Sequence, residues 1–166
     1  MLSKKWTLIL PIILLIISVG LVDNVIAQKQ KSQIESLVEK SDVIVLGEVT
    51  EMRSVWNETK SKIFTEVSIR VKDNLKGSEN NQTVVIKHLG GEVDGVGELY
   101  SHIPKFTRDE EVLVFAKRDK ENNLRVTKGH EGKFKITKDM TTGEKLIGSS
   151  KSLNDFSTRI KSFIKK

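Results

Sequence analysis

The chain of 166 residues contains no cysteine. Its absence excludes disulfide bonds, lipid attachment through a cysteine and thiolate metal sites. Small exported domains often depend on disulfides, so a domain of this sequence must be held together by packing alone. The composition fits a prokaryotic cell envelope better than an animal extracellular matrix.

Aromatic residues that could stack on nucleic-acid bases are also scarce. The chain has one tyrosine, Tyr100, and two tryptophans, of which only Trp56 lies beyond the amino-terminal apolar segment. Proteins that bind single strands rely on several stacking side chains. A nucleic acid is therefore not the expected partner.

The sequence has no pattern that is typical of an active site. It lacks a cysteine nucleophile and a Gly-x-Ser-x-Gly elbow. His88, His102 and His130 are too far apart in sequence to form a ligand pair within one strand or helix, so they could meet only through the fold. We expect no enzyme, no cofactor and no metal site.

The amino-terminal segment has the order of a secretory signal peptide. Lys4 and Lys5 precede an uncharged stretch from Trp6 to Val22, and Val25-Ile26-Ala27 offers suitable residues for a signal peptidase. We expect residues 1–27 to be removed, which leaves one exported domain.

An uncleaved membrane anchor is the alternative, because the 17 uncharged residues from Trp6 to Val22 reach the short end of a membrane-spanning helix. In both cases residues 28–166 form a single domain outside the cytoplasm, either secreted or associated with the envelope. Contact with a membrane is expected only through an uncleaved leader.

The charge of the exported domain is positive. Removing Lys4, Lys5 and Asp23 with the leader leaves 26 basic and 21 acidic side chains, and 26 − 21 gives a net charge of +5. Basic residues spread along a chain are typical of a solvated surface and, secondly, of a surface that binds anions.

The remaining pattern is a series of short strands between two helices. Ser32 begins a capping box that predicts a short helix to about Lys40, and Gly47 marks a bend in the first strand. An amphipathic helix from Ser152 closes the chain, with an apolar stripe that packs on the strands or, alternatively, lies on a membrane. Apolar alternation predicts strands over residues 42–52, 63–71, 83–88, 111–117, 124–126 and 133–136.

These elements predict a mainly β fold with peripheral helices. We expect a small OB-like barrel of five or six strands, with a short amino-terminal helix and an amphipathic carboxy-terminal helix.

Several short motifs, taken as a set, resemble a family of exported, mostly uncharacterised prokaryotic proteins. Their strand pattern is in turn similar to the OB-fold barrel of tissue inhibitors of metalloproteinases and netrin-like modules. The motifs cover about residues 41–136 and are Ser41-Asp42-Val43-Ile44-Val45-Leu46-Gly47-Glu48-Val49, Trp56, Ile63-Phe64-Thr65-Glu66-Val67, Leu75-Lys76-Gly77, Leu89-Gly90-Gly91, Pro104-Lys105-Phe106, Glu110-Glu111-Val112-Leu113-Val114-Phe115 and Gly132-Lys133-Phe134.

The resemblance implies a fold more than an activity. The animal inhibitors chelate the zinc of a protease through an amino-terminal cysteine, and this chain has none. The family usually has glycine where Asp109 stands, and aspartate is a common substitute for glycine in a turn.

Residues Leu89 to Gly97 hold four glycines in nine positions and predict a shaped loop instead of a regular element. The loop lacks a Gly-Lys-Ser/Thr ending, its acidic residues would repel phosphate, and two carboxylates are too few for a calcium shell. OB barrels bind ligands through strand faces and neighbouring loops. If the domain has a binding surface, we expect it at Gly90, Gly91, Glu92, Asp94, Tyr100, His102 and Phe106.

Two triplets match the acceptor pattern for N-glycosylation. They begin at Asn57 and Asn81, and both lie in predicted loops. Modification at either site depends on the host in which the protein is made.

These observations predict an exported, non-catalytic binding module whose partner is a protein, a peptide or a polyanionic glycan. The first alternative is a protease inhibitor that uses the glycine-rich segment. The second is a weak metal-dependent hydrolase built from the three histidines.

Overall fold

The computed structural model describes residues 33–77, 82–148 and 150–165. The chain divides into two compact units, Met1–Ser36 and Leu37–Lys166. The second unit contains the whole sheet and the carboxy-terminal helix. The expected leader and its cleavage site lie outside the described residues.

Both predicted helices are present. Residues 33–40 are helical, which confirms the short amino-terminal helix, although Ser32 lies outside the described residues. The carboxy-terminal helix α2 covers Leu153–Ile164. No helix within the described ranges is both long enough and apolar enough to span a membrane.

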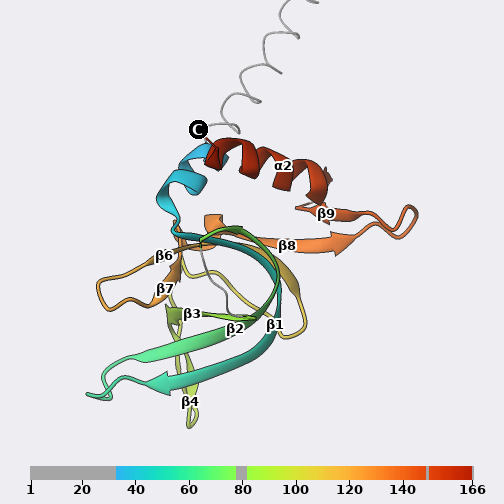
Figure 1. Ribbon diagram of the computed structural model, residues 1–166. Coiled ribbons are helices and arrows are strands. Elements are labelled where there is room, and N and C mark those ends of the chain that lie inside the picture. Colours follow the sequence, from blue (N-terminus) through green and yellow to red (C-terminus); the bar gives the residue numbers. More distant parts are fainter. Residues whose placement is uncertain (1–32, 78–81, 149, 166) are drawn as a thin grey trace, which may run out of the picture. The chain divides into compact units, whose positions relative to one another are not determined.

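Five strands form a barrel-like ring, which confirms the predicted mainly β, barrel-like architecture (Figure 1). Strand β1 pairs antiparallel with both β2 and β6, β2 pairs antiparallel with β3, and β6 pairs antiparallel with β7. The ring is not fully closed, because the parallel pairing of β3 with β7 consists of the single residue pair Ile86 and Leu124. The strands are β1 (Val43–Trp56), β2 (Ile63–Lys76), β3 (Thr83–Leu89), β6 (Glu111–Arg118) and β7 (Leu124–Val126).

Strands β1 and β2 are longer than predicted and curve together around the ring (Figure 1). The pattern predicted their ends at Met52 and Val71, because the alternation of buried side chains is lost beyond these points. Residues 72–74 of β2 are exposed, and residues 54–56 of β1 are half-buried. The backbone ladder nevertheless continues to Trp56 and Lys76. The predicted bend at Gly47 is confirmed by a register shift, and a Cβ there would overlap the backbone of Arg70.

Apolar alternation fills the ring. In β2, Ile63, Thr65, Val67 and Ile69 are buried, and Val67 and Ile69 join Val45 of β1 in the interior cluster. Strand β6 is buried on both faces, since one face lines the ring and the other packs through a row of aromatic side chains toward α2. This row joins Phe115 of β6, Phe134 of β8 and Phe156 of α2, with successive ring centroids 5.8 and 5.4 Å apart.

The sheet continues from β6 through three further strands, β8 (Lys133–Lys138), β9 (Lys145–Ile147) and β10 (Lys151–Ser152). The pattern predicted β8 only, because strands of three and two residues are too short to show alternation. The apolar stripe of α2 is buried at Leu153, Phe156 and Ile160, whereas Ile164 at the end of the helix is exposed.

The prediction of an irregular loop over residues 89–97 is wrong. Strands β4 (Gly91–Val93) and β5 (Val96–Glu98) form an antiparallel hairpin. Asp94 and Gly95 have φ angles of 52° and 79°, as the two central residues of a tight hairpin turn require. The sequence Val93-Asp94-Gly95-Val96 carries this turn signal, which the count of glycines obscured.

Candidate functional site

A groove of about 820 Å³ lies beside the β4–β5 hairpin. One side is built by the hairpin and the segment that follows it, and the other by the adjoining parts of β1, β2 and β3. The volume falls in the range of ligand-binding clefts, about 300–1,000 Å³. The lining residues are Met52, Ser54, Thr65, His88, Leu89, Gly90, Gly91, Glu92, Gly97, Glu98, Leu99, Tyr100, Ser101, Ile103, Pro104, Lys105 and Phe106.

Three polar side chains in one row across the sheet contribute to this groove. Ser54 of β1 is the register partner of Thr65 of β2, and Thr65 is the partner of His88 of β3. The hydroxyls of Ser54 and Thr65 are 2.9 Å apart, and Thr65 Oγ1 donates to the carbonyl oxygen of Gly90 at 2.7 Å. These bonds tie the start of the hairpin to the barrel wall.

Gly91 makes this close approach possible. Its φ angle is 135°, and a Cβ at this position would overlap both Ser54 Oγ and Thr65 Oγ1. Only glycine fits here without displacing the hairpin. The glycine therefore determines the shape of the groove.

His88 is held in one orientation. Its ring stacks on Phe106 with centroids 6.2 Å apart, and Nδ1 lies 2.9 Å from the carbonyl oxygen of Leu89, so Nδ1–H donates and Nε2 carries the lone pair. Nε2 is buried and has no hydrogen-bond partner within the described residues. Burial lowers the pKa of His88; the bond to Leu89 opposes this effect and the charge of Arg125 adds to it.

The lowered pKa of His88 predicts acid-sensitive stability. In the unfolded chain the imidazole titrates near 6.5, above its pKa in the folded domain. Between these two values the unfolded chain binds more protons, so the free energy of unfolding decreases as the pH falls from neutral through this window. In urea denaturation at several pH values, His88→Phe, which keeps a ring against Phe106, should flatten this decrease. An equal decrease in the variant would exclude His88 as its source.

Glu98, the register partner of Gly91, fixes the open end of the hairpin from its second strand. Its Oε2 accepts hydrogen bonds from the backbone N–H of Ile63 at 3.1 Å and from the hydroxyl of Tyr100 at 3.2 Å. The carboxylate thus joins the end of β5 to the start of β2, and it holds the Tyr100 ring at the groove.

Exposed apolar side chains gather at the groove. Met52 is 38 % exposed, Tyr100 39 % and Leu99 88 %, and all three line it. Val96 of β5, in the same hairpin, is 50 % exposed. Four of the seven exposed large hydrophobic residues in the described part of the chain therefore belong to this region, and such clustering marks an interaction site.

The structure brings together five of the seven residues expected at a binding surface, namely Gly90, Gly91, Glu92, Tyr100 and Phe106. The other two do not line the groove. Asp94 occupies the hairpin turn, and the ring of His102 stacks on His130 with centroids 6.2 Å apart. The His102 carbonyl also accepts a bond from the His130 N–H at 3.2 Å, so its backbone is fixed against the short 3-10 helix η1 (Gly129–Gly132).

Sequence reasoning missed the strand residues of the groove. Ser54, Thr65 and His88 come from three different strands, and only the register between the strands aligns them. Met52 and Ser54 have the spacing of one strand face, which is the signal that was present. His102 and His130 lie together, whereas His88 stacks on Phe106. No group of three or more potential metal ligands occurs within the described residues.

The first glycosylation triplet lies in the turn between β1 and β2. Asn57 Oδ1 accepts bonds from the backbone N–H groups of Ser61 and Lys62 at 2.8 and 3.0 Å, and Nδ2 donates to Thr59 Oγ1 at 2.9 Å. The amide is thus used in folding the turn. Asn81 lies outside the described residues.

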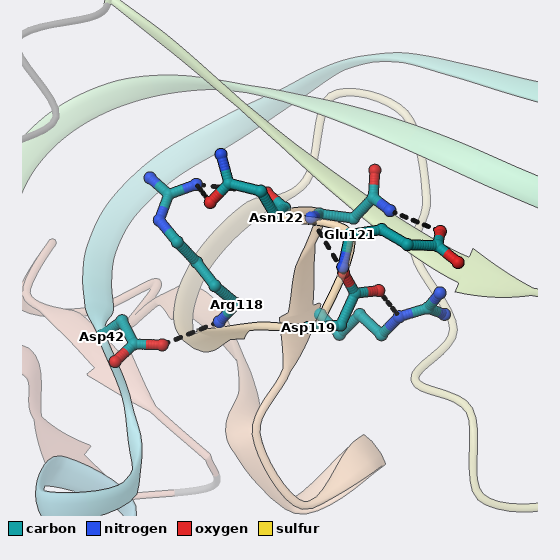
Figure 2. A network of polar contacts seen from close by, with 7 residues as sticks. Asp42, Arg118, Asp119, Glu121 and Asn122 are labelled. Carbon is teal, nitrogen blue, oxygen red and sulfur yellow. Dashed lines mark hydrogen bonds and ion pairs between the residues drawn. The ribbon is translucent and has the colours of Figure 1, made fainter.

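A second polar cluster fixes the turn between β6 and β7, and Figure 2 shows it at close range. Asp119 accepts bonds from the backbone of Glu121 and Asn123 and pairs with Arg125, which holds the pKa of Asp119 below its usual value. The backbone N–H of Arg118 donates to Asp42 Oδ2 at 2.7 Å. These bonds are all used within the turn and its neighbours, so the cluster has a structural role.

Comparison with known proteins adds no assignment: no family model matches the chain, and no match was found among curated proteins.

Proposed function

We propose that the domain is an exported, non-catalytic binding module that takes an extended segment of another protein into the groove beside the β4–β5 hairpin. The observation that carries the proposal is the clustering of exposed Met52, Leu99 and Tyr100 at this groove. Burying a large apolar side chain contributes about 1.5–3 kcal/mol, so a few such contacts are sufficient for specific binding. Export is inferred from the leader sequence.

The charges of the groove favour a protein segment over a polyanionic glycan. Glu92 and Glu98 line it together with one cation, Lys105. Two carboxylates and one ammonium group leave an excess of negative charge, which repels sulfate and carboxylate groups. The apolar walls and the backbone of the hairpin suit a peptide chain.

The polar groups of the groove support binding without catalysis. Thr65 Oγ1 donates its proton to the Gly90 carbonyl, and His88 Nε2 has no partner within the described residues. A nucleophilic hydroxyl requires a base within hydrogen-bond reach. Neither Ser54 nor Thr65 is bonded to such a base among the described residues. The Tyr100 hydroxyl donates to Glu98, but the same carboxylate oxygen also accepts the backbone N–H of Ile63 and so has a structural role.

Random peptides displayed on phage provide the test. We expect the domain to select peptides with apolar side chains, and the variant Met52→Ser, Leu99→Ser, Tyr100→Ser should bind them at least about tenfold more weakly. The matched control is Val85→Thr, Met140→Ser, because both residues are exposed apolar side chains that do not line the groove. The control should bind as the wild type does.

Equal binding by the groove variant and the wild type would overturn the proposal. Failure to select any peptide would also count against it. Inhibition of an envelope protease that is lost when the hairpin turn is changed would support the inhibitor alternative instead.

A further inference from the structure

A second hollow, of about 430 Å³, lies between the turn at residues 107–110 and strands β8 and β9. Four cations line it: Arg108 from the turn, Lys135 and Lys138 from β8, and Lys145 from β9. None of these residues lines the groove proposed to bind a protein segment. The hollow is therefore a separate feature of the surface.

The turn that carries Arg108 is rigidly attached to the barrel. Glu110 Oε1 accepts a bond from the backbone N–H of Thr107 at 2.8 Å and pairs with Lys133 Nζ at 2.6 Å. Two backbone bonds join the turn to β1, from Asp109 N to the Val49 oxygen at 2.8 Å and from Val49 N to the Glu110 oxygen at 3.0 Å. The backbone of Arg108 is therefore fixed at the rim of the hollow.

Most of the negative charge around the hollow is already neutralised. Glu110 pairs with Lys133, and Glu111 pairs with Lys145 at 2.7 Å and with Lys72 at 3.6 Å. Asp109 is the only lining carboxylate whose side chain has no ion pair within the described part of the chain.

Three of the cations that line the hollow are unpaired within the described residues. The side chains of Arg108, Lys135 and Lys138 form no hydrogen bond or ion pair with any described residue, and all three are exposed. Three unpaired cations facing one unpaired carboxylate give the hollow an excess of positive charge. Solubility alone does not favour unpaired cations gathered around one concavity, since like charges repel.

We propose that this hollow binds an anionic phosphate group. A planar guanidinium can donate two parallel hydrogen bonds to phosphate oxygens, and the ammonium groups of Lys135 and Lys138 on β8 add point charges. The hydroxyls of Thr107 and Thr137, which also line the hollow, are further donors. The volume accommodates a pyrophosphate or a phosphodiester group. This inference does not depend on the function proposed for the groove.

The test is calorimetric titration of the full domain with inorganic pyrophosphate at low ionic strength, where screening is weakest. The variant Arg108→Gln, Lys135→Gln, Lys138→Gln should bind at least about tenfold more weakly than the wild type. The matched control Lys117→Gln, Lys120→Gln, Lys151→Gln removes the same net charge from exposed positions outside the hollow and should change the affinity less than about twofold. Asp109→Asn removes the unpaired carboxylate and should strengthen binding.

The proposal is overturned if pyrophosphate does not bind, or if both triple variants weaken binding equally, since the effect would then arise from overall charge. Vesicles of phosphatidylglycerol distinguish the source of the phosphate. Pyrophosphate that competes with the vesicles for the domain supports a discrete site that also accepts lipid headgroups. Vesicle binding that the control variant loses as fully as the hollow variant would indicate general surface charge and contradict the proposal.

Discussion

Gly91→Ala should lower the free energy of unfolding by about 2 kcal/mol and reduce peptide binding in the groove. The added Cβ overlaps Ser54 Oγ and Thr65 Oγ1, and the φ angle of 135° is one that alanine rarely adopts. The hairpin must therefore move away from the barrel wall. Chemical denaturation measures the first effect and titration with a selected peptide measures the second.

Gly97→Ala is the control within the same hairpin. Gly97 is the register partner of Glu92, and a Cβ at residue 97 would come no closer than 4.0 Å to its nearest neighbour, the Gly91 oxygen. This substitution should change the stability by less than about 0.5 kcal/mol. If Gly91→Ala were equally harmless, the hairpin would not be held against Ser54 and Thr65 as described.

Glu110→Ala should lower the free energy of unfolding by about 3 kcal/mol, because it leaves a mostly buried cation without its partner. The side chains of Glu110 and Lys133 are only 5 % and 12 % exposed, and their charged atoms are 2.6 Å apart. The ammonium group also donates to the Lys105 oxygen at 2.7 Å and lies 5.1 Å from the centre of the Phe106 ring. Loss of the carboxylate should thus disturb both the turn at residues 107–110 and the groove wall.

A double-mutant cycle separates the ion pair from the other contacts. Lys133→Met in the Glu110→Ala background removes the unpaired charge, so the double variant should be more stable than the sum of the two single changes predicts. Urea denaturation of the four proteins gives the coupling energy. Simple additivity would show that the pair contributes little to stability.

The amount of the fold that was predictable varied with burial. The buried strand β6 was predicted to within one residue, because continuous burial leaves an apolar signal at each position. Strand β7 was predicted with its observed ends, because its two buried apolar residues flank one arginine in simple alternation. The far halves of β1 and β2 carry no such signal, since the side chains there are half-buried in β1 and mostly exposed in β2, while the backbone ladder continues. The hairpin of β4 and β5 was not predicted, because the glycine of its turn, Gly95, cannot be told by sequence from the close-packed Gly90 and Gly91.

The candidate groove was predictable only in part, for a similar reason. Local composition was sufficient to predict Gly90, Gly91 and Glu92, whereas only the register between strands brings Ser54 and His88 to the groove. His102 was predicted at the binding surface because it follows Tyr100 closely. The contact between its carbonyl and His130, some distance further along the chain, could not be read from that local order.

The order in which the ring is assembled also has a kinetic consequence. The strands β1, β2 and β3 are neighbours in sequence and can pair as soon as Leu89 has been synthesised. The other edge of β1 pairs with β6, for example Ile44 with Phe115, so it stays uncovered until β6 is available. That edge carries Val43, Ile44 and Val45, a run of β-branched residues, so the partly made chain presents an aggregation-prone template. A chain whose last essential pairing is so distant in sequence is expected to fold slowly, and this one edge stays open to intermolecular pairing until β6 has docked.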